Sequence, residues 1–314
     1  MFSSIYSTFV DRGPSHLLHA IVSLSVGMFQ SFVLGNRFVK RRIYDYHLWL
    51  DMKDRGISRT LLLFGERELE HKIMLERILK PGMKVFDVGA NIGYYAIMES
   101  KLVGDNGSIL AVEPSPSNVA LLKRNLELNG VVNTIVREGA VSDKAETKKF
   151  YLAHQSNLNT FHDTGSGLEH LSGKTIDVQT FTVPDLAREY GVPDLLRMDV
   201  EGHEVQVLAG MVGAIRDKKI RPIVIFETHL SRYSAENDFR PVLEALFEQG
   251  YSVSLAASSW EAGSEKVKKF GYSSSGSIRS DGVEREFFEN ISNQDALEII
   301  CNCGGLRTVV LSAS

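Results

Sequence analysis

The chain has 314 residues, of which 43% are apolar and 24% charged, and its formal net charge is −4. This length suits about two domains, or one α/β domain with additions, and the ordinary composition excludes a disordered, collagen-like or disulfide-framework protein. The acidic balance argues against a nucleic-acid partner. Residues 1–80, however, hold twelve Lys and Arg against eight Asp and Glu, so we expect this part to meet a different environment from the rest.

The two cysteines of the chain indicate the cellular compartment in which the protein is expected. Cys301 and Cys303 lie one residue apart, too close to clamp a domain, and the tail supplies no further ligands for a zinc site. We expect two free thiols and a cytoplasmic location, where thiols stay reduced.

A charge-free run lies between Arg12 and Arg37, and its centre, residues 17–34, has twelve apolar residues of eighteen. Its polar residues recur at spacings of three and four, which predicts an amphipathic helix with one polar stripe. The sequence therefore predicts an N-terminal amphipathic helical extension over residues 1–44. Packing on its own domain, self-association or membrane-surface attachment through residues 14–42, and a membrane span all stay open, whereas a signal peptide fits poorly.

From residue 84 onward, apolar runs and helical periodicities alternate, which predicts a mostly parallel sheet with helices on both faces. Before it, we expect strands at 41–51 and 56–65 and a helix at 66–79, and we assign 45–83 to a lead-in segment. Further strands are predicted at 84–89, 108–114, 132–141, 146–153, 176–183, 194–202, 221–229, 251–257 and 306–312. Helices are predicted at 91–103, 115–130, 184–190, 203–217 and 235–250.

Residues 258–305 separate the last two predicted strands, where a hairpin would suffice. Insertions of this length are usually functional lids or spacers. We favour a lid that covers the substrate. Part of it, YSSSGSIRSDG at 272–282, looks flexible.

The loop after the first core strand, VFDVGANIGYYA at 85–96, has the character of a ligand-binding turn. Gly89 and Gly93 let the backbone turn sharply in front of a helix N-terminus, and Asn91 tolerates left-handed backbone angles. A dinucleotide loop would need glycines at positions 91 and 94, which are Asn91 and Tyr94, so that pattern fails twice.

Two carboxylates belong to the same region of the predicted sheet. Glu113 ends the second core strand, where a carboxylate can accept hydrogen bonds from a ribose diol. Asp87 lies inside an apolar strand and would be costly to bury without partners, so we expect it to meet backbone N–H groups as well as ligand.

Four segments carry a family resemblance: DVGANIGYYA (87–96), VEPSPSNVALLKRNLELNG (112–130), RMDVEGHEVQVLAG (197–210) and IVIFETH (223–229). Together they resemble the FkbM-type S-adenosylmethionine-dependent methyltransferases, over roughly residues 45–256. The DVEGHE string at 199–204 is the most specific of these motifs. The resemblance implies a class I methyltransferase, Rossmann-like fold with a seven-stranded sheet closed by an antiparallel strand, and a methyltransferase domain over 84–314.

The resemblance also implies S-adenosylmethionine as the cofactor, and O-methylation of a hydroxyl on a sugar, glycoside or related small molecule. It places five residues around the methionine portion: Asp87, Gly89, Ala90, Asn91 and Gly93. Glu113 would hold the ribose and Asp199 would lie near the sulfonium. Glu138, Gly139 and Ala140 would lie along the adenine.

Methyl transfer to a hydroxyl needs alignment of the reacting atoms and a base for the hydroxyl proton. The predicted ends of two neighbouring strands bring together Asp199, Glu201 and His203 from one, and Glu227 and His229 from the other. We expect Asp199 near the substrate and His203 or His229 as the base, since histidine titrates in the useful range.

Alternatives to these assignments stay open. His203 could instead orient the helix that follows, and His229 could merely end its strand. A divalent metal on Asp199, Glu201 and Glu227 is conceivable, although the spacing does not demand one. An RNA or protein methyltransferase and a non-catalytic nucleotide-binding module are the competing functions.

Overall fold

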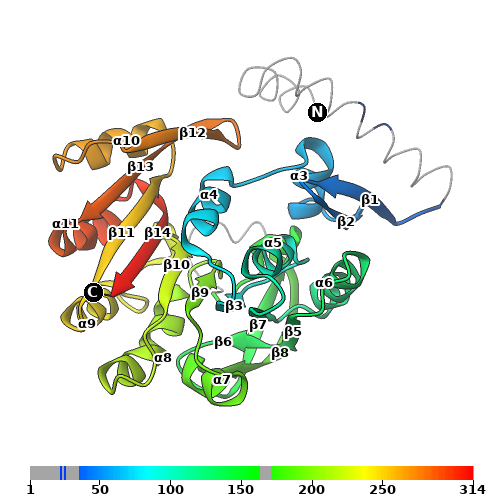
Figure 1. Ribbon diagram of the computed structural model, residues 1–314, viewed down its shortest axis with the longest axis horizontal. Helices are drawn as coiled ribbons and strands as arrows, with labels where there is room; N and C mark the ends of the chain where they lie inside the picture. The colour runs from blue at the N-terminus through cyan, green and yellow to red at the C-terminus, as the bar shows by residue number, and fades with distance from the viewer. Residues whose placement is uncertain (1–21, 23–24, 26–34, 163–170, 314) are drawn as a thin grey trace.

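The computed structural model describes residues 22, 25, 35–162 and 171–313. Its centre is a nine-stranded sheet in the order β12-β13-β11-β14-β10-β9-β3-β4-β5 (Figure 1). Five neighbours run parallel: β10 (Ile223–Glu227), β9 (Leu195–Met198), β3 (Lys84–Val88), β4 (Ser108–Glu113) and β5 (Thr134–Glu138). The last strand, β14 (Leu306–Ala313), lies antiparallel between β10 and β11 (Tyr251–Ser258).

Helices cover both faces of this sheet because its strands are apolar on both sides. Successive residues of β3 show the alternation: Val85 packs in one buried cluster, while Phe86 and Val88 pack in the other. The first cluster contains α4 (Leu69–Ile78), α5 (Tyr94–Val103) and α6 (Pro116–Leu128). The second contains α7 (Val183–Tyr190), α8 (Glu204–Arg216), α9 (Arg240–Glu248) and α11 (Asn293–Glu298).

The predicted α/β class with helices on both faces is confirmed, but the seven-stranded sheet is wrong. The two extra strands, β12 (Gly276–Ser280) and β13 (Val283–Ile291), come from the 258–305 insertion. β13 pairs antiparallel with β11 and covers an edge that would otherwise be open, and β12 pairs with β13. The residues around 276–280 that looked flexible are therefore a strand.

The remainder of the insertion also has regular structure. It forms α10 (Glu261–Lys268), α11 and a π-helical turn at Ile299–Cys303. Both cysteines of that turn are free. Within the insertion, β12 and β13 extend the sheet, and the turn at 280–282 hydrogen-bonds to the lead-in segment. The role of the insertion as a lid stays a prediction.

The lead-in segment differs from its prediction. Residues 41–51 are not one strand, because the chain turns at Tyr44, whose φ is 51°, to form the hairpin β1 (Phe38–Ile43) and β2 (Tyr46–Asp51). The strand expected at 56–65 is the helix α3 (Ile57–Phe64), which buries Ile57, Leu61 and Leu62 on one side. A short apolar run of this kind fits either element by periodicity alone.

The predicted N-terminal helix falls almost entirely outside the described residues. Val22 and Ser25 are helical, whereas residues 38–43, which the prediction included, form β1. No helix within the described ranges is long and apolar enough to cross a membrane.

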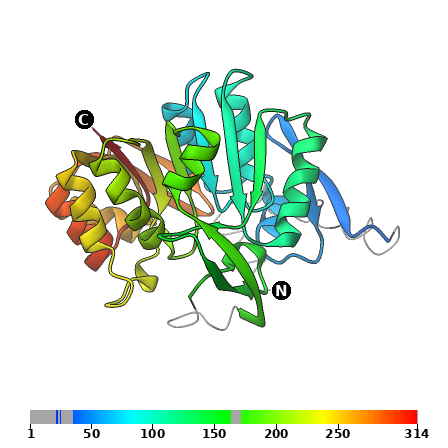
Figure 2. The ribbon, with the colours of Figure 1, turned by 90° about the horizontal axis from the view of Figure 1, so that it is seen from below.

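A small second sheet grows out of the end of β5. Gly139, with φ of 136°, directs the chain away from the large sheet into β6 (Ala140–Val141), which pairs with β8 (Leu171–Phe181). β8 in turn pairs antiparallel with β7 (Thr147–Ala153), and this ribbon projects from the body of the molecule (Figure 2). The chain after β7 returns toward the ends of β3, β4 and β9, where it forms part of a cavity.

The turn before α5 depends on glycine at position 93. Gly93 has φ of 93°, and a Cβ there would lie 2.7 Å from Leu122 Cδ1 of α6. We expect Gly93→Ala to lower the free energy of unfolding by about 1–3 kcal/mol, through backbone strain and overpacking. Gly213→Ala is the control, because Gly213 lies within α8 with open space around it and should gain about 0.5–1 kcal/mol. Urea unfolding measures both, and equal effects of the two substitutions would contradict this account.

Candidate functional site

A cavity lies where β3, β4 and β9 end, the edge at which parallel sheets bind ligands. We call it the donor cavity. The strand ends contribute Gly89, Asn91, Glu113 and Asp199 to its wall. The chain from 150 to 161 closes another side with Phe150 and Phe161, and α4 approaches with Glu68.

The glycine loop has the predicted backbone. Asn91 adopts a left-handed φ of 50°, as expected for the residue that stands in place of a further glycine. Gly89, with φ of 81°, allows β9 to come close, since a Cβ there would lie 2.3 Å from the Asp199 carbonyl oxygen. The side-chain oxygen of Asn91 is buried without a hydrogen-bond partner, so this wall offers an unsatisfied acceptor to a ligand.

Glu113 is the buried carboxylate of the donor cavity, with 4% of its surface exposed. It accepts hydrogen bonds from the backbone N–H groups of Asn91 (2.9 Å) and Ser115 (3.0 Å) and from Asn118 Nδ2 (3.1 Å). Burial nevertheless raises the pKa of Glu113 to about 7. A ligand hydroxyl that donates to this carboxylate would favour its charged form.

The three residues predicted along the adenine separate in the structure. Ala140 lines the donor cavity, whereas Glu138 is exposed at the end of β5. Gly139 packs against the small sheet, where a Cβ would lie 2.6 Å from the Gln179 carbonyl oxygen. The aromatic wall, Phe150 and Phe161, was not predicted, because only the folded β7–β8 ribbon brings this loop to the strand ends.

Asp87 and Gly93 lie behind the cavity rather than in its wall. The fully buried Asp87 accepts a hydrogen bond from Arg197 Nη1 at 3.0 Å. Arg197 Nη2 lies 3.5 Å from Asp199 Oδ2, and its guanidinium stacks over the Tyr95 ring at 4.2 Å. Arg197 therefore links the carboxylate behind the cavity to the carboxylate in its wall.

Sequence reasoning missed Arg197, although a signal was present. Arg197 lies inside an apolar strand, as Asp87 does, and the two are partners in the parallel register of β9 and β3. A cation and an anion inside two neighbouring buried strands predict an ion pair, because neither is stable there alone.

The two histidines differ strongly in protonation. Burial, together with His162 and Lys148, lowers the pKa of His203 to about 3. His203 Nε2 lies 3.0 Å from Ser142 Oγ, and the ring packs on Phe161 at 4.5 Å. Burial alone would lower the pKa of His229, but Glu204, Glu201 and Asp199 raise it to about 10.

These pKa values argue against both histidines as the base. His203 remains neutral near pH 7 and holds a proton very weakly. His229 is already protonated there, with Nδ1 2.7 Å from Glu204 Oε1. Its Nε2 faces Glu201 Oε2 at 3.7 Å and Asp199 Oδ1 at 4.0 Å.

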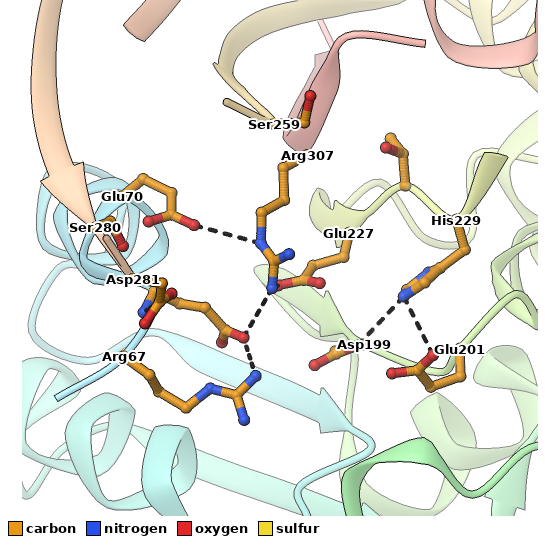
Figure 3. Close-up of polar contacts among 12 residues, drawn as sticks. Arg67, Glu70, Asp199, Glu201, Glu227, His229, Ser259, Ser280, Asp281 and Arg307 are labelled. Atoms are coloured by element: carbon orange, nitrogen blue, oxygen red, sulfur yellow. Dashed lines mark hydrogen bonds and ion pairs between the residues drawn. The ribbon is translucent and has the colours of Figure 1, made fainter. Parts of the chain in front are cut away.

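Asp199 is the centre of a larger cluster of charges (Figure 3). Its carboxylate lies with Glu201 and His229 on one side and with Glu68 and Glu227 on the other, with ligand atoms of each group within 4.8 Å of one another. Arg307 from β14 bridges Glu68 at 3.0 Å and Glu227 at 3.1 Å, and Arg67 also pairs with Glu68.

The metal alternative named Asp199, Glu201 and Glu227, but the structure groups these carboxylates differently. Arginines already neutralise Glu68, Asp199 and Glu227, so no metal is assigned here. Glu68, Arg67 and Arg307 could not be predicted as site residues, because they come from distant segments that meet only in the fold.

The pKa of His229 has a consequence for stability. Folding raises the pKa of His229 from about 6.5 to about 10. The contribution of the protonated ring to the free energy of unfolding is therefore complete below pH 6.5 and is lost as the pH rises to about 10. We expect His229→Gln to destabilise the protein more at pH 6.5 than at pH 9.5, as measured by urea unfolding. His154→Gln, at an exposed position, is the control. A destabilisation by His229→Gln that does not change over this range would contradict the raised pKa.

Comparison with known proteins gives the family. The model of the methyltransferase FkbM domain matches residues 87–253, slightly more than half of the chain. The 31-O-demethyl-FK506 methyltransferase FkbM of Streptomyces tacrolimicus is 29% identical over 163 residues, which cover 43% of this chain and 62% of that protein. The methyltransferase sdnD of Sordaria araneosa is 28% identical over 207 residues, 56% of this chain and 76% of that protein.

Among solved structures, the methyltransferase FkbM of Methylobacillus flagellatus KT matches with a TM-score of 0.35 and 13% identity, over 86% of this chain and 62% of that one. The fold assignment rests on the strand order described above rather than on this likeness. The family model, the glycine loop and the buried carboxylate at the end of β4 agree with one another. The chain therefore belongs to the FkbM family of S-adenosylmethionine-dependent methyltransferases.

Proposed function

We propose that this protein transfers a methyl group from S-adenosylmethionine to a hydroxyl of a sugar, glycoside or related small molecule. The observation that carries the proposal is the donor cavity, in which a ribose-binding type of carboxylate, Glu113, and the carboxylate cluster around Asp199 line one space. The relative from Streptomyces tacrolimicus is a 31-O-demethyl-FK506 methyltransferase, which supports an oxygen acceptor.

The residues of the donor cavity fit this cofactor. Glu113 can accept hydrogen bonds from the ribose hydroxyls, and the unsatisfied Asn91 oxygen can accept one from a donor group of the ligand. The adenine ring of the cofactor would meet an apolar surface formed by Phe150, Phe161 and Ala140. When bound, the cofactor supplies a methyl group on a sulfonium; as the acceptor oxygen bonds to that carbon, the carbon–sulfur bond breaks and the sulfur keeps the electron pair.

The acceptor hydroxyl must lose its proton, and Glu201 is the group that we propose to take it. Arg67 and Arg307 hold the pKa of Glu68 well below its usual range, which makes Glu68 a weak base. Glu201 lines the donor cavity and faces His229 instead. Burial, with the charges of Asp199 and Glu204, raises the pKa of Glu201 to about 7 even though His229 opposes the shift.

Glu201 shares an unusual backbone conformation with Glu68 and Asp281. Its φ is 52°, in the left-handed region that side chains other than glycine and asparagine rarely adopt. Strained conformations of this kind persist where the surrounding structure over-determines them, often in active sites. Glu227, whose pKa burial raises to about 8, lies outside the lining of the donor cavity, so we assign it the role of holding Arg307.

Binding of the cofactor tests the donor half of the proposal. We expect S-adenosylmethionine and S-adenosylhomocysteine to bind, NAD not to bind, and Glu113→Ala to weaken the first two by at least about tenfold, through loss of hydrogen bonds to a charged group. Glu138→Ala is the matched control, since Glu138 is exposed and outside the donor cavity. Isothermal titration measures all of these. Equal affinities in wild type and Glu113→Ala, or binding of NAD alone, would refute the assignment.

The pH dependence of the rate tests the base. We expect the rate of methyl transfer to rise through pH 7 as Glu201 loses its proton, and Glu201→Gln to lower kcat about 10²-fold or more and to remove that limb. S-Adenosylhomocysteine release measures the rate, and titration should give an unchanged affinity for S-adenosylmethionine. A Glu201→Gln enzyme that keeps the wild-type pH profile would exclude Glu201 as the base.

A further inference from the structure

The β1–β2 hairpin of the lead-in segment has one buried side and one exposed side. Val39 of β1 is 4% exposed and packs in the core. Side chains alternate along a strand, so Phe38, Lys40 and Arg42 lie on the opposite side. Trp49 of β2 stands directly across from Lys40 and shares that side. We call the side with Phe38, Lys40, Arg42 and Trp49 the hairpin face.

The hairpin face carries positive charge that the described residues do not neutralise. Lys40 is exposed and has no ion pair within the described ranges. Arg42 is exposed, and its Nε donates to the backbone carbonyl of Tyr44 at 2.9 Å rather than to a carboxylate. Asp45, the acidic residue of the hairpin turn, pairs with Lys101 at 2.7 Å. The charges of Lys40 and Arg42 are therefore open to an external anion.

A third cation extends the hairpin face onto α6. The guanidinium of Arg124 lies over the rings of Trp49, at 4.2 Å, and Phe38, at 5.0 Å, and no described carboxylate pairs with it. Arg124 is itself exposed. Aromatic rings beside exposed cations are typical of surfaces that lie at the boundary between a charged layer and an apolar one.

The chain enters this hairpin from an uncharged run. Residues 13–36 contain no Asp, Glu, Lys or Arg, and Val22 within this run is helical and 53% exposed. The sequence predicts an amphipathic helix here, and an amphipathic helix followed by exposed cations is typical of attachment to a membrane surface. Residues 81–314, by contrast, hold 23 Lys and Arg against 31 Asp and Glu, so an anionic surface would repel most of the molecule.

We propose that the hairpin face, together with the run at 13–36, attaches this protein to the surface of a membrane that contains anionic lipids. Lys40, Arg42 and Arg124 would meet the lipid phosphates, while the uncharged run lies among the headgroups and the upper acyl chains. A nucleic acid would also attract these cations, but it offers no apolar layer to the run that precedes them. This inference does not depend on the proposed methyl transfer.

The membrane is tested with vesicles and the full-length protein. The probes are vesicles of phosphatidylcholine alone and of phosphatidylcholine with about one third phosphatidylserine. We expect sedimentation with the anionic vesicles to be at least about tenfold stronger, and to weaken as NaCl rises from about 0.1 M to about 0.5 M, because salt screens the attraction. Equal binding to both kinds of vesicle, or binding to neither, would overturn the proposal.

The hairpin face is tested by removing two of its charges. We expect Lys40→Gln with Arg42→Gln to lower the partition onto anionic vesicles at least about tenfold, since each cation near the lipid surface contributes to binding. Arg216→Gln with Lys269→Gln is the matched control, because these exposed residues end α8 and α10, away from the hairpin (Figures 1 and 2). An equal loss in the two double variants would show that only net charge matters and would overturn the assignment to this face.

The uncharged run is tested by adding one charge to it at two neighbouring positions. Val22→Asp replaces an exposed apolar side chain, whereas Ser23→Asp adds the same charge to the predicted polar stripe. We expect the first to lower vesicle binding at least about fivefold more than the second, because a charge is costly in the apolar layer. Equal effects of the two would overturn the role of the run. Urea unfolding with equal midpoints establishes that every variant is folded.

Binding to nucleic acid is the competing outcome. Filter binding of a single-stranded RNA that is lost in Lys40→Gln with Arg42→Gln, without sedimentation of the wild type with vesicles, would overturn the membrane as the partner and assign the hairpin face to nucleic acid.

Discussion

The arrangement of the strand ends at the donor cavity depends on one buried ion pair between the neighbouring strands β3 and β9. Arg197 is 2% exposed in the middle of β9, and Asp87, its partner in β3, is fully buried. Leaving either charge alone in the interior would cost about 3–5 kcal/mol, so the pair constrains how the two strands approach each other. The other nitrogen of the guanidinium, Nη2, lies near Asp199 and holds this carboxylate at the centre of the cluster of charges.

Around Asp199 the electrostatics divide the carboxylates into two kinds. Glu68 illustrates the first: burial would raise its pKa, but Arg67 and Arg307 hold it well below the usual range. Glu201 illustrates the second, because its neighbour is a histidine and other carboxylates add to the effect of burial. One patch of protein can therefore hold fixed negative charges and also a group able to accept a proton near pH 7.

Polar contacts join the segments that this chain adds to the common fold. Ion pairs among Glu68, Glu70, Arg285 and Arg307 join the lead-in helices to the edge insertion. The Ser156 N–H donates to Asp54 Oδ1 and joins the chain after β7 to the lead-in segment. Such a network is costly to assemble unless every charge is paired, which favours a single arrangement of the three segments. The same network connects them to β14, the last strand of the sheet.

The sequence by itself determined the alternation of strands and helices from residue 84, the left-handed turn at Asn91 and the carboxylate Glu113 at the end of β4. These features follow from local pattern: apolar runs bounded by glycine, and residue types whose backbone preferences are intrinsic. The helix α3, the nine strands of the sheet, the aromatic wall and the meeting of Glu68, Asp199 and Arg307 were decided only by the tertiary structure. An apolar run of eight residues fits a helix or a strand equally well, and contacts between segments hundreds of residues apart leave no local pattern. The protonation of His203 and His229 belongs to the same group, because burial and neighbouring charges move their pKa values in opposite directions, and neither is visible until the chain has folded.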